Sequence, residues 1–226
     1  MQVEICTPSR QSAEAAKTGG AKRIELCRDL ACGGLTPFDE DIEYCVRTLS
    51  VRTHVLVRPR AGDFCYNAAE IDEIARCIKR CKVLGVHAVV IGFLLPDGHV
   101  DEELTRRMVQ LASPMEVTFH RAFDEAKQSP LEALKVIAAC GCHRLLTSGQ
   151  RPTALEGADV IQQLVAAATP VKILAGSGVT PANVRELVAQ TGVTEVHGSC
   201  KSTLPDGTIQ TDAAQVRQLI ENVANL

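Results

Sequence analysis

The stretch VKILAGSGVTPANV, residues 171–184, predicts a strand, a glycine loop and the start of a helix in direct succession. Its first part, VKILAG, is apolar and β-branched, as in a strand buried in a parallel sheet. Thr180 and Pro181 then place a capping hydroxyl before a proline, and Gly192 marks the expected end of the helix. The stretch therefore predicts one βα unit.

The same unit recurs along the chain. Short apolar segments followed by a loop and a helical pattern lie at 3–6, 23–27, 54–59, 88–93, 116–120, 144–148, 171–176 and 195–199. Eight units favour a (β/α)8 TIM barrel, although an open doubly wound sheet is built from much the same succession. No Pro/Gly/Ser-rich linker interrupts the series, so we expect residues 1–226 to form a single domain.

Helix signals fill the gaps between these segments. Ser129-Pro130 and Thr36-Pro37 each place a hydroxyl before a proline, and Gly141 stands where one of these helices should stop. Between residues 68 and 84, apolar side chains recur at steps of three and four residues, at Ile71, Ile74, Ile78 and Cys81. This spacing predicts a helix with one apolar face against the sheet.

Length and charge restrict the class of protein. The 226 residues are 46% hydrophobic, and 24 Lys and Arg against 27 Asp and Glu give a net charge of −3. Without a basic run studded with aromatic residues, nucleic acid is not expected as a partner. The start MQVEICTPSR lacks the apolar region of a signal peptide, and every apolar run is shorter than the roughly 20 residues that span a bilayer. We therefore expect a cytoplasmic protein that does not bind membranes.

Ionisable side chains gather at the ends of the predicted strands, where barrels of this class carry their sites. They alternate toward one face: Glu4 with Cys6, Glu25 with Cys27, Arg58 with Arg60, His120, and Glu195 with His197. One such residue alone usually serves structure, but opposite charges converging in a partly dry mouth shift each other's pKa, as acid–base catalysis requires. The candidate catalytic residues are Glu4, Glu25, Arg58, His120 and His197.

For catalysis we expect His120 to lie within hydrogen-bonding reach of Glu25, with Arg58 close enough to hold the negative charge of a substrate. Such a pair would suit proton transfer next to a carbonyl group. The alternative is a structural network in which His120 and Glu25 only satisfy each other and seal the barrel.

The loop Gly176-Ser177-Gly178 offers backbone N–H groups before a helix, which favours binding of a phosphate or carboxylate. The alternative is that these glycines only form a tight turn. We also expect Arg60 and Asp63, which follow the third strand, to bind substrate.

Ten cysteines are many for a cytoplasmic chain, but their spacing does not repeat as zinc-binding pairs do. Cys6 and Cys27 lie at matched depth on strands expected about 4.8 Å apart, so their thiols can share a soft ion such as Cu(I). The alternative is a pair of packed core thiols. Cys140 and Cys142 flank Gly141 in a predicted loop and suggest no site.

Several of these segments also resemble the CutC family, whose members are usually named copper homeostasis proteins. The motifs that carry the resemblance, in order, are RIELC (23–27), GGLTP (33–37), RPRAGDFCY (58–66), TFHRAFD (118–124), LTSGQ (146–150), AGSGV (175–179) and EVH (195–197). The resemblance runs from residue 2 to about 200. Ala61 stands where glycine is usual and Phe38 where serine is usual, and many members carry a longer loop after the eighth strand.

The resemblance implies a cytoplasmic (β/α)8 barrel that forms a homo-oligomer, often a dimer, with Cu(I) bound through Cys6 and Cys27. It implies no established reaction. Two functions follow: a copper-binding homeostasis protein, and an enzyme that acts by acid–base chemistry on a small phosphate- or carboxylate-bearing substrate. We adopt the first as the main hypothesis.

Overall fold

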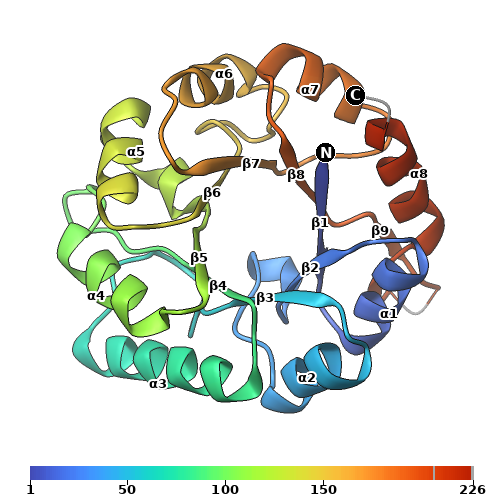
Figure 1. Cartoon of the computed structure of the whole chain (residues 1–226), viewed down its shortest axis with the longest axis horizontal. Helices are drawn as coiled ribbons and strands as arrows, with labels where there is room; N and C mark the ends of the chain where they lie inside the picture. The colour runs from blue at the N-terminus through green and yellow to red at the C-terminus, as the bar shows by residue number, and fades with distance from the viewer. Residues whose placement is uncertain (206, 225–226) are drawn as a thin grey trace.

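The computed structural model of the chain describes residues 1–205 and 207–224. Eight parallel strands close into a barrel in sequential order, which confirms the predicted (β/α)8 fold (Figure 1). The strands are β1 (Gln2–Thr7), β2 (Arg23–Leu26), β3 (Arg52–Leu56), β4 (Ala88–Ile91), β5 (Glu116–Phe119), β6 (Arg144–Thr147), β7 (Lys172–Gly176) and β8 (Glu195–Gly198). Each coincides with one predicted segment, to within a few residues at its ends.

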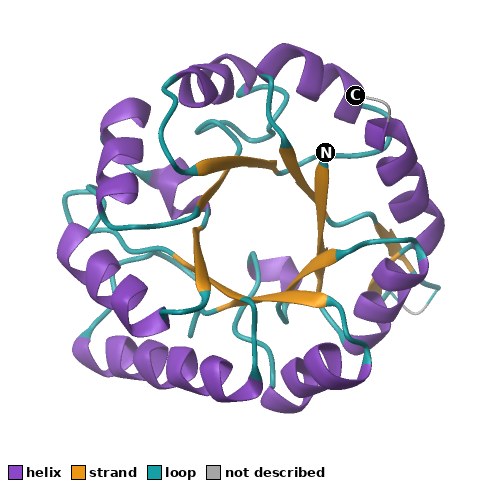
Figure 2. Ribbon diagram, in the orientation of Figure 1, coloured by secondary structure: helices purple, strands orange, loops and turns teal. Residues whose placement is uncertain are grey.

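Helices form an outer ring around the strands (Figure 2). The α-helices are α1 (Arg10–Thr18), α2 (Asp39–Glu43), α3 (Ala68–Leu84), α4 (Glu102–Ala112), α5 (Pro130–Ala139), α6 (Ala158–Ala166), α7 (Val184–Thr191) and α8 (Ala213–Ala224). Three short helical segments are η1 (Leu30–Cys32), η2 (Tyr44–Thr48) and η3 (Arg121–Glu125). None of the helices in the described ranges combines the length and the apolar character needed to cross a lipid bilayer.

The predicted cap of α5 and the predicted range of α3 are confirmed. Ser129 caps α5, with Pro130 in its first turn, as predicted. Helix α3 spans the predicted range and buries Ile74, Ile78 and Cys81 against the barrel. Its start is fixed by Asn67, which forms a reciprocal capping box with a glutamate in the first turn.

Two helices begin later than the sequence indicates. Helix α7 starts at Val184 rather than near Pro181, because Asn183 accepts a hydrogen bond from Thr180 N at 2.8 Å and closes a turn first. Helix α2 starts at Asp39, because the hydroxyl of Thr36 is occupied elsewhere. That hydroxyl accepts from Arg58 N at 2.8 Å and donates to Arg58 O at 3.0 Å, which ties the loop before α2 to the end of β3.

The lower interior of the barrel is an ion-pair network. Arg23 Nη2 donates to Glu195 Oε2 at 2.6 Å, and Arg144 Nε donates to the same oxygen at 2.9 Å. Arg23 Nε also lies 2.8 Å from Glu4 Oε2. All four side chains are buried. Charged residues here replace the branched aliphatic layers usual in such barrels.

A short antiparallel hairpin follows the eighth strand and was not predicted. It consists of β9 (Lys201–Thr203) and β10 (Ile209–Thr211). It leads into α8, which lies between α7 and α1 and completes the outer ring (Figure 1). Because the hairpin starts directly after β8, it brings Lys201 to the rim of the barrel mouth.

Candidate functional site

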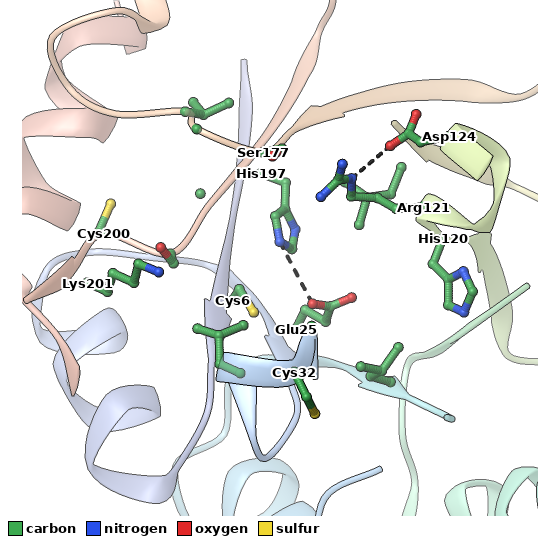
Figure 3. A pocket seen from close by; sticks show the side chains of 18 of the residues that line it. Cys6, Glu25, Cys32, His120, Arg121, Asp124, Ser177, His197, Cys200 and Lys201 are labelled. Atoms are coloured by element: carbon green, nitrogen blue, oxygen red, sulfur yellow. Dashed lines mark hydrogen bonds and ion pairs between the residues drawn. The ribbon is translucent and has the colours of Figure 1, made fainter. Parts of the chain in front are cut away.

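A cavity of about 670 Å³ opens at the C-terminal ends of the strands (Figure 3). Its lining includes Cys6, Glu25, Arg58, His120, Ser177 and His197. Leucine and phenylalanine side chains lie among these polar groups. The mouth therefore has the volume of a small-molecule site, and its wall mixes charged and polar side chains with apolar ones.

Two free thiols lie together at this end of the barrel: Cys6 lines the cavity, whereas Cys27 is packed beside it and is not part of the lining. Cys6 Sγ and Cys27 Sγ are 3.8 Å apart and both side chains are buried. Strand register causes this proximity, since Cys6 is opposite Glu25 on β2 and Cys27 follows two residues later on the same face. The hydrogen bond to Cys27, together with burial, raises the pKa of Cys6 well above its usual value.

His197 stands beside this thiol pair. Its Nε2 lies 3.8 Å from Glu25 Oε2 (Figure 3), and its Nδ1 lies 2.9 Å from Glu4 Oε1. The ligating atoms of Cys6, Glu25 and His197 all lie within 4.8 Å of one another. Sulfur, imidazole and carboxylate donors at this spacing form a candidate metal site.

Glu4 lies below the cavity rather than in its lining. It contacts Arg23 and His54 at 2.8 Å each, as well as His197. Burial raises the pKa of Glu4, but these three basic groups outweigh it and hold the pKa well below its usual value. The carboxylate of Glu4 is therefore an acceptor, so His197 Nδ1 donates to it and the ring presents Nε2 to the cavity.

The pKa values of Glu25 and His197, which lie above Glu4, are both raised. Burial raises the pKa of Glu25. Burial lowers the pKa of His197, but its contacts with Cys6, Glu25 and Glu4 raise that pKa well above 6.5. A carboxyl and an imidazole at ion-pair distance on the floor of a cavity can act as an acid–base pair.

The predicted pairing of His120 with Glu25 is wrong. His120 Nδ1 accepts a hydrogen bond from Ala122 N at 3.1 Å, because His120 ends β5 and caps η3. Its ring packs on Phe64, with the centroids 4.8 Å apart. Burial, followed by the charge of Arg58, lowers the pKa of His120 to about 3. The imidazole partner of Glu25 is His197 instead.

Arg58 and Arg60 separate at the end of β3. Arg58 is buried in the cavity wall, where its guanidinium lies 5.0 Å from the centre of the Phe64 ring. Arg60 Nε donates to Glu70 at 2.6 Å, and Arg60 Nη2 donates to Asp63 at 3.0 Å. Arg60 and Asp63 lie outside the cavity lining, so their position gives no contact with a ligand there.

The residues Gly176-Ser177-Gly178 at the end of β7 have two different roles. Ser177 and Gly178 line the cavity, where their proposed contact with an anion stays a prediction. Gly176 is needed for packing, since a Cβ atom there would lie 2.6 Å from Leu146 Cδ1 and 3.2 Å from His197 Cβ.

The sequence interpretation missed Arg121, Asp124 and Lys201 in the lining. Arg121 Nε donates to Asp124 at 2.7 Å (Figure 3), and Asp124 also accepts from Ser148 N at 3.0 Å. The signal was present in the motif TFHRAFD, where Arg121 and Asp124 are three residues apart. Lys201 carried no signal, because the hairpin that positions it was not predicted.

Sequence comparison links the chain to known proteins. The model of the CutC family matches residues 1–202. The family protein CutC of Porphyromonas gingivalis is 42% identical over 206 residues, which cover 91% of this chain and 83% of that protein. The corresponding protein of Chromobacterium violaceum is 44% identical over 200 residues, or 88% of this chain and 81% of that one.

Structural comparison gives the same relation. A Streptococcus agalactiae protein, provisionally named a copper homeostasis protein CutC, superposes with a TM-score of 0.83 at 29% identity, covering 88% of this chain and 98% of that chain. The N-(5'-phosphoribosyl)anthranilate isomerase of Pyrococcus furiosus has a TM-score of 0.61 at 14% identity, with all of both chains covered. At that identity the likeness concerns the fold alone.

Proposed function

Because the chain belongs to the CutC family, we propose that it acts in copper homeostasis and binds one Cu(I) ion through the thiolates of Cys6 and Cys27. The observation that carries the proposal is the 3.8 Å separation of the two Sγ atoms. Metal–thiolate bonds are about 2.3 Å long, so one ion can contact both sulfurs without the strands moving apart. Thiolates are soft ligands and favour Cu(I) over harder cations.

His197 is the proposed third ligand. Its imidazole and Cys6 Sγ belong to one group of donor atoms within 4.8 Å, and imidazole is a good ligand for copper. Glu25, a harder carboxylate donor, is better suited to pass on to solvent the proton that Nε2 gives up. The ion is cargo in this proposal, held in an open mouth from which it can be passed on.

Acid–base catalysis on a small anionic substrate is the second candidate function. The Glu25–His197 pair at the base of a cavity of about 670 Å³ favours it. Copper binding and catalysis would use the same imidazole, so turnover must be assayed in metal-free protein. The predicted homo-oligomer remains a prediction, and the mass in solution tests it.

Competition against a colorimetric Cu(I) chelator under anaerobic conditions tests the copper proposal. We expect about one ion per chain, and losses in affinity of about tenfold or more in Cys6→Ser and in Cys27→Ser, because each removes one thiolate. Cys77→Ser is the matched control, since that thiol also lies beside a second cysteine but on α3, outside the mouth. Equal copper affinity in wild type and the Cys6→Ser/Cys27→Ser variant would show that the two thiols only pack in the core and do not bind the ion.

A further inference from the structure

Arg58 is a buried cation without an anionic partner. Its side chain is 6% exposed, and Nη1 and Nη2 donate only to main-chain carbonyls, those of Cys32 at 3.1 Å, Gly34 at 3.2 Å and Gly62 at 2.8 Å. Nε makes no hydrogen bond of good geometry, the hydroxyl of Tyr66 beside the guanidinium is a neutral group, and no carboxylate in the described ranges pairs with Arg58. A guanidinium at this depth normally has a carboxylate or phosphate beside it, because burying an unpaired charge is costly.

Arg60, two residues along the chain, shows the usual arrangement. It pairs with both Glu70 and Asp63 although it is more exposed than Arg58. The contrast between the two arginines places the uncompensated charge inside the cavity and the compensated charge outside it.

His120 adds an unused hydrogen-bond donor to the same wall. Its Nδ1 accepts from Ala122 N, so Nδ1 carries no proton and the proton of the ring sits on Nε2. Nε2 is buried and has no partner in the part of the chain that the structure describes, and the whole residue is 5% exposed. Buried N–H groups without acceptors are rare in proteins, and each requires an explanation.

The two features lie together. Phe64 packs against both, since Arg58 lies 5.0 Å and the His120 ring 4.8 Å from its centre. Both line the cavity, and Figure 3 places His120 on the side of the pocket away from Cys200 and Lys201. A positive charge and a fixed N–H donor beside an aromatic ring recognise an oxyanion.

We propose that Arg58 and His120 bind the oxyanion group, a carboxylate or a phosphate monoester, of a small organic molecule in the barrel mouth. Oxygen atoms of the ligand accept from His120 Nε2 and compensate the charge of Arg58. Apolar lining from Leu30, Leu56 and Leu146 contacts its carbon skeleton. This site is independent of the copper proposal, because it uses none of the thiols of the copper site, and it gives the second candidate function its anion-binding residues.

Nitrogen NMR of the histidine side chains tests the proposal on metal-free wild-type protein. Before any addition, His120 should show a protonated Nε2 and an unprotonated Nδ1. Titration with succinate or inorganic phosphate, against sodium chloride of equal ionic strength, should shift the His120 Nε2–H signal saturably. Absence of a saturable shift with both anions up to the order of 100 mM, or an equal shift with chloride, overturns the site.

Variants provide the second arm, read by calorimetric titration with the better of the two anions. His120→Phe keeps a ring against Phe64 but removes the donor, and we expect about tenfold to a hundredfold weaker binding. Arg60→Gln, the control outside the cavity, should bind within twofold of wild type. Unchanged affinity in His120→Phe overturns the proposal. The Cys6→Ser/Cys27→Ser variant should retain anion binding, so failure of the copper proposal and failure of this one are distinguishable.

Discussion

The 2.9 Å contact between His197 Nδ1 and Glu4 Oε1 decides which nitrogen of His197 reaches the cavity. Glu4 is the fixed member of this pair, since Arg23 and His54 hold it from below. Glu4 therefore acts through His197, as a positioning residue beneath the site. It is a sequence-derived catalytic candidate that the structure places one step away from the cavity.

Replacement of Glu4 by glutamine should lower both stability and copper affinity. The variant keeps the shape of the side chain but leaves Arg23 without one of its two carboxylates. Breaking a buried ion pair costs about 3–5 kcal/mol, which urea unfolding can measure. Copper affinity should also fall, because the neutral amide oxygen holds His197 Nδ1–H less firmly than the carboxylate does. Arg52→Gln, which alters a partly exposed pair with Glu116, is the control and should have a small effect on both.

Stability should decline steeply in acid because of Glu4. Its pKa in the folded protein is well below the usual 4.5, so the ionised carboxylate favours folding. The contribution is fully present above the unfolded-state pKa and is lost as pH falls through the folded-state pKa. Unfolding free energies between about pH 7 and pH 3 should therefore fall, and the slope should be shallower in Glu4→Gln. Identical slopes would show that other carboxylates dominate acid unfolding.

Cu(I) binding should release protons and strengthen as pH rises. The pKa values of Cys6 and His197 are both raised, so at neutral pH the metal-free protein carries protons on a ligating sulfur and on the imidazole. Metals bind the deprotonated forms, so binding must displace these protons. Titration in two buffers of different ionisation enthalpy measures their number. Binding without proton uptake by the buffer would contradict these assignments.

Gly176→Ala should weaken copper binding although the residue contacts no ion. The added methyl group would lie 2.6 Å from Leu146 Cδ1 and 3.2 Å from His197 Cβ, so both side chains must shift. Leu146 can move the end of its side chain, but His197 must also give by a few tenths of an ångström, which worsens its fit to an ion shared with Cys6. Gly192→Ala is the control: among the residues that the structure describes, no atom lies within 4 Å of its added methyl group, so its positive φ affects stability alone. Equal copper affinity in Gly176→Ala and Gly192→Ala would show that Gly176 has no influence on the copper site.

Periodicity was sufficient to predict the barrel and its thiol pair. Strands buried on both faces give continuous apolar segments, and alternation along β1 and β2 places Cys6 and Cys27 on the interior face. Such rules state which face a side chain occupies. They do not state its partner across the barrel, and this is why Glu25 was paired with His120 rather than with His197.

Side-chain hydrogen bonds to the main chain account for the other differences. His120 turns to Ala122 N, and Asn183 delays the start of α7. Arg58 and Arg60 are both arginines and lie two residues apart after β3. Arg58 lines the cavity, whereas Arg60 pairs with carboxylates outside it. These choices depend on which carbonyl and carboxylate groups the folded loops bring near, and local sequence does not contain that information.

The ion pairs below the mouth restrict the route by which a ligand enters and leaves the barrel. Glu195 with Arg23 and Arg144 fill the interior beneath the cavity, so the barrel is a cup rather than a channel. Whatever occupies the cup leaves by the rim through which it came. Under the copper proposal, a donor and an acceptor of the ion therefore have to dock in turn on that same face of the barrel.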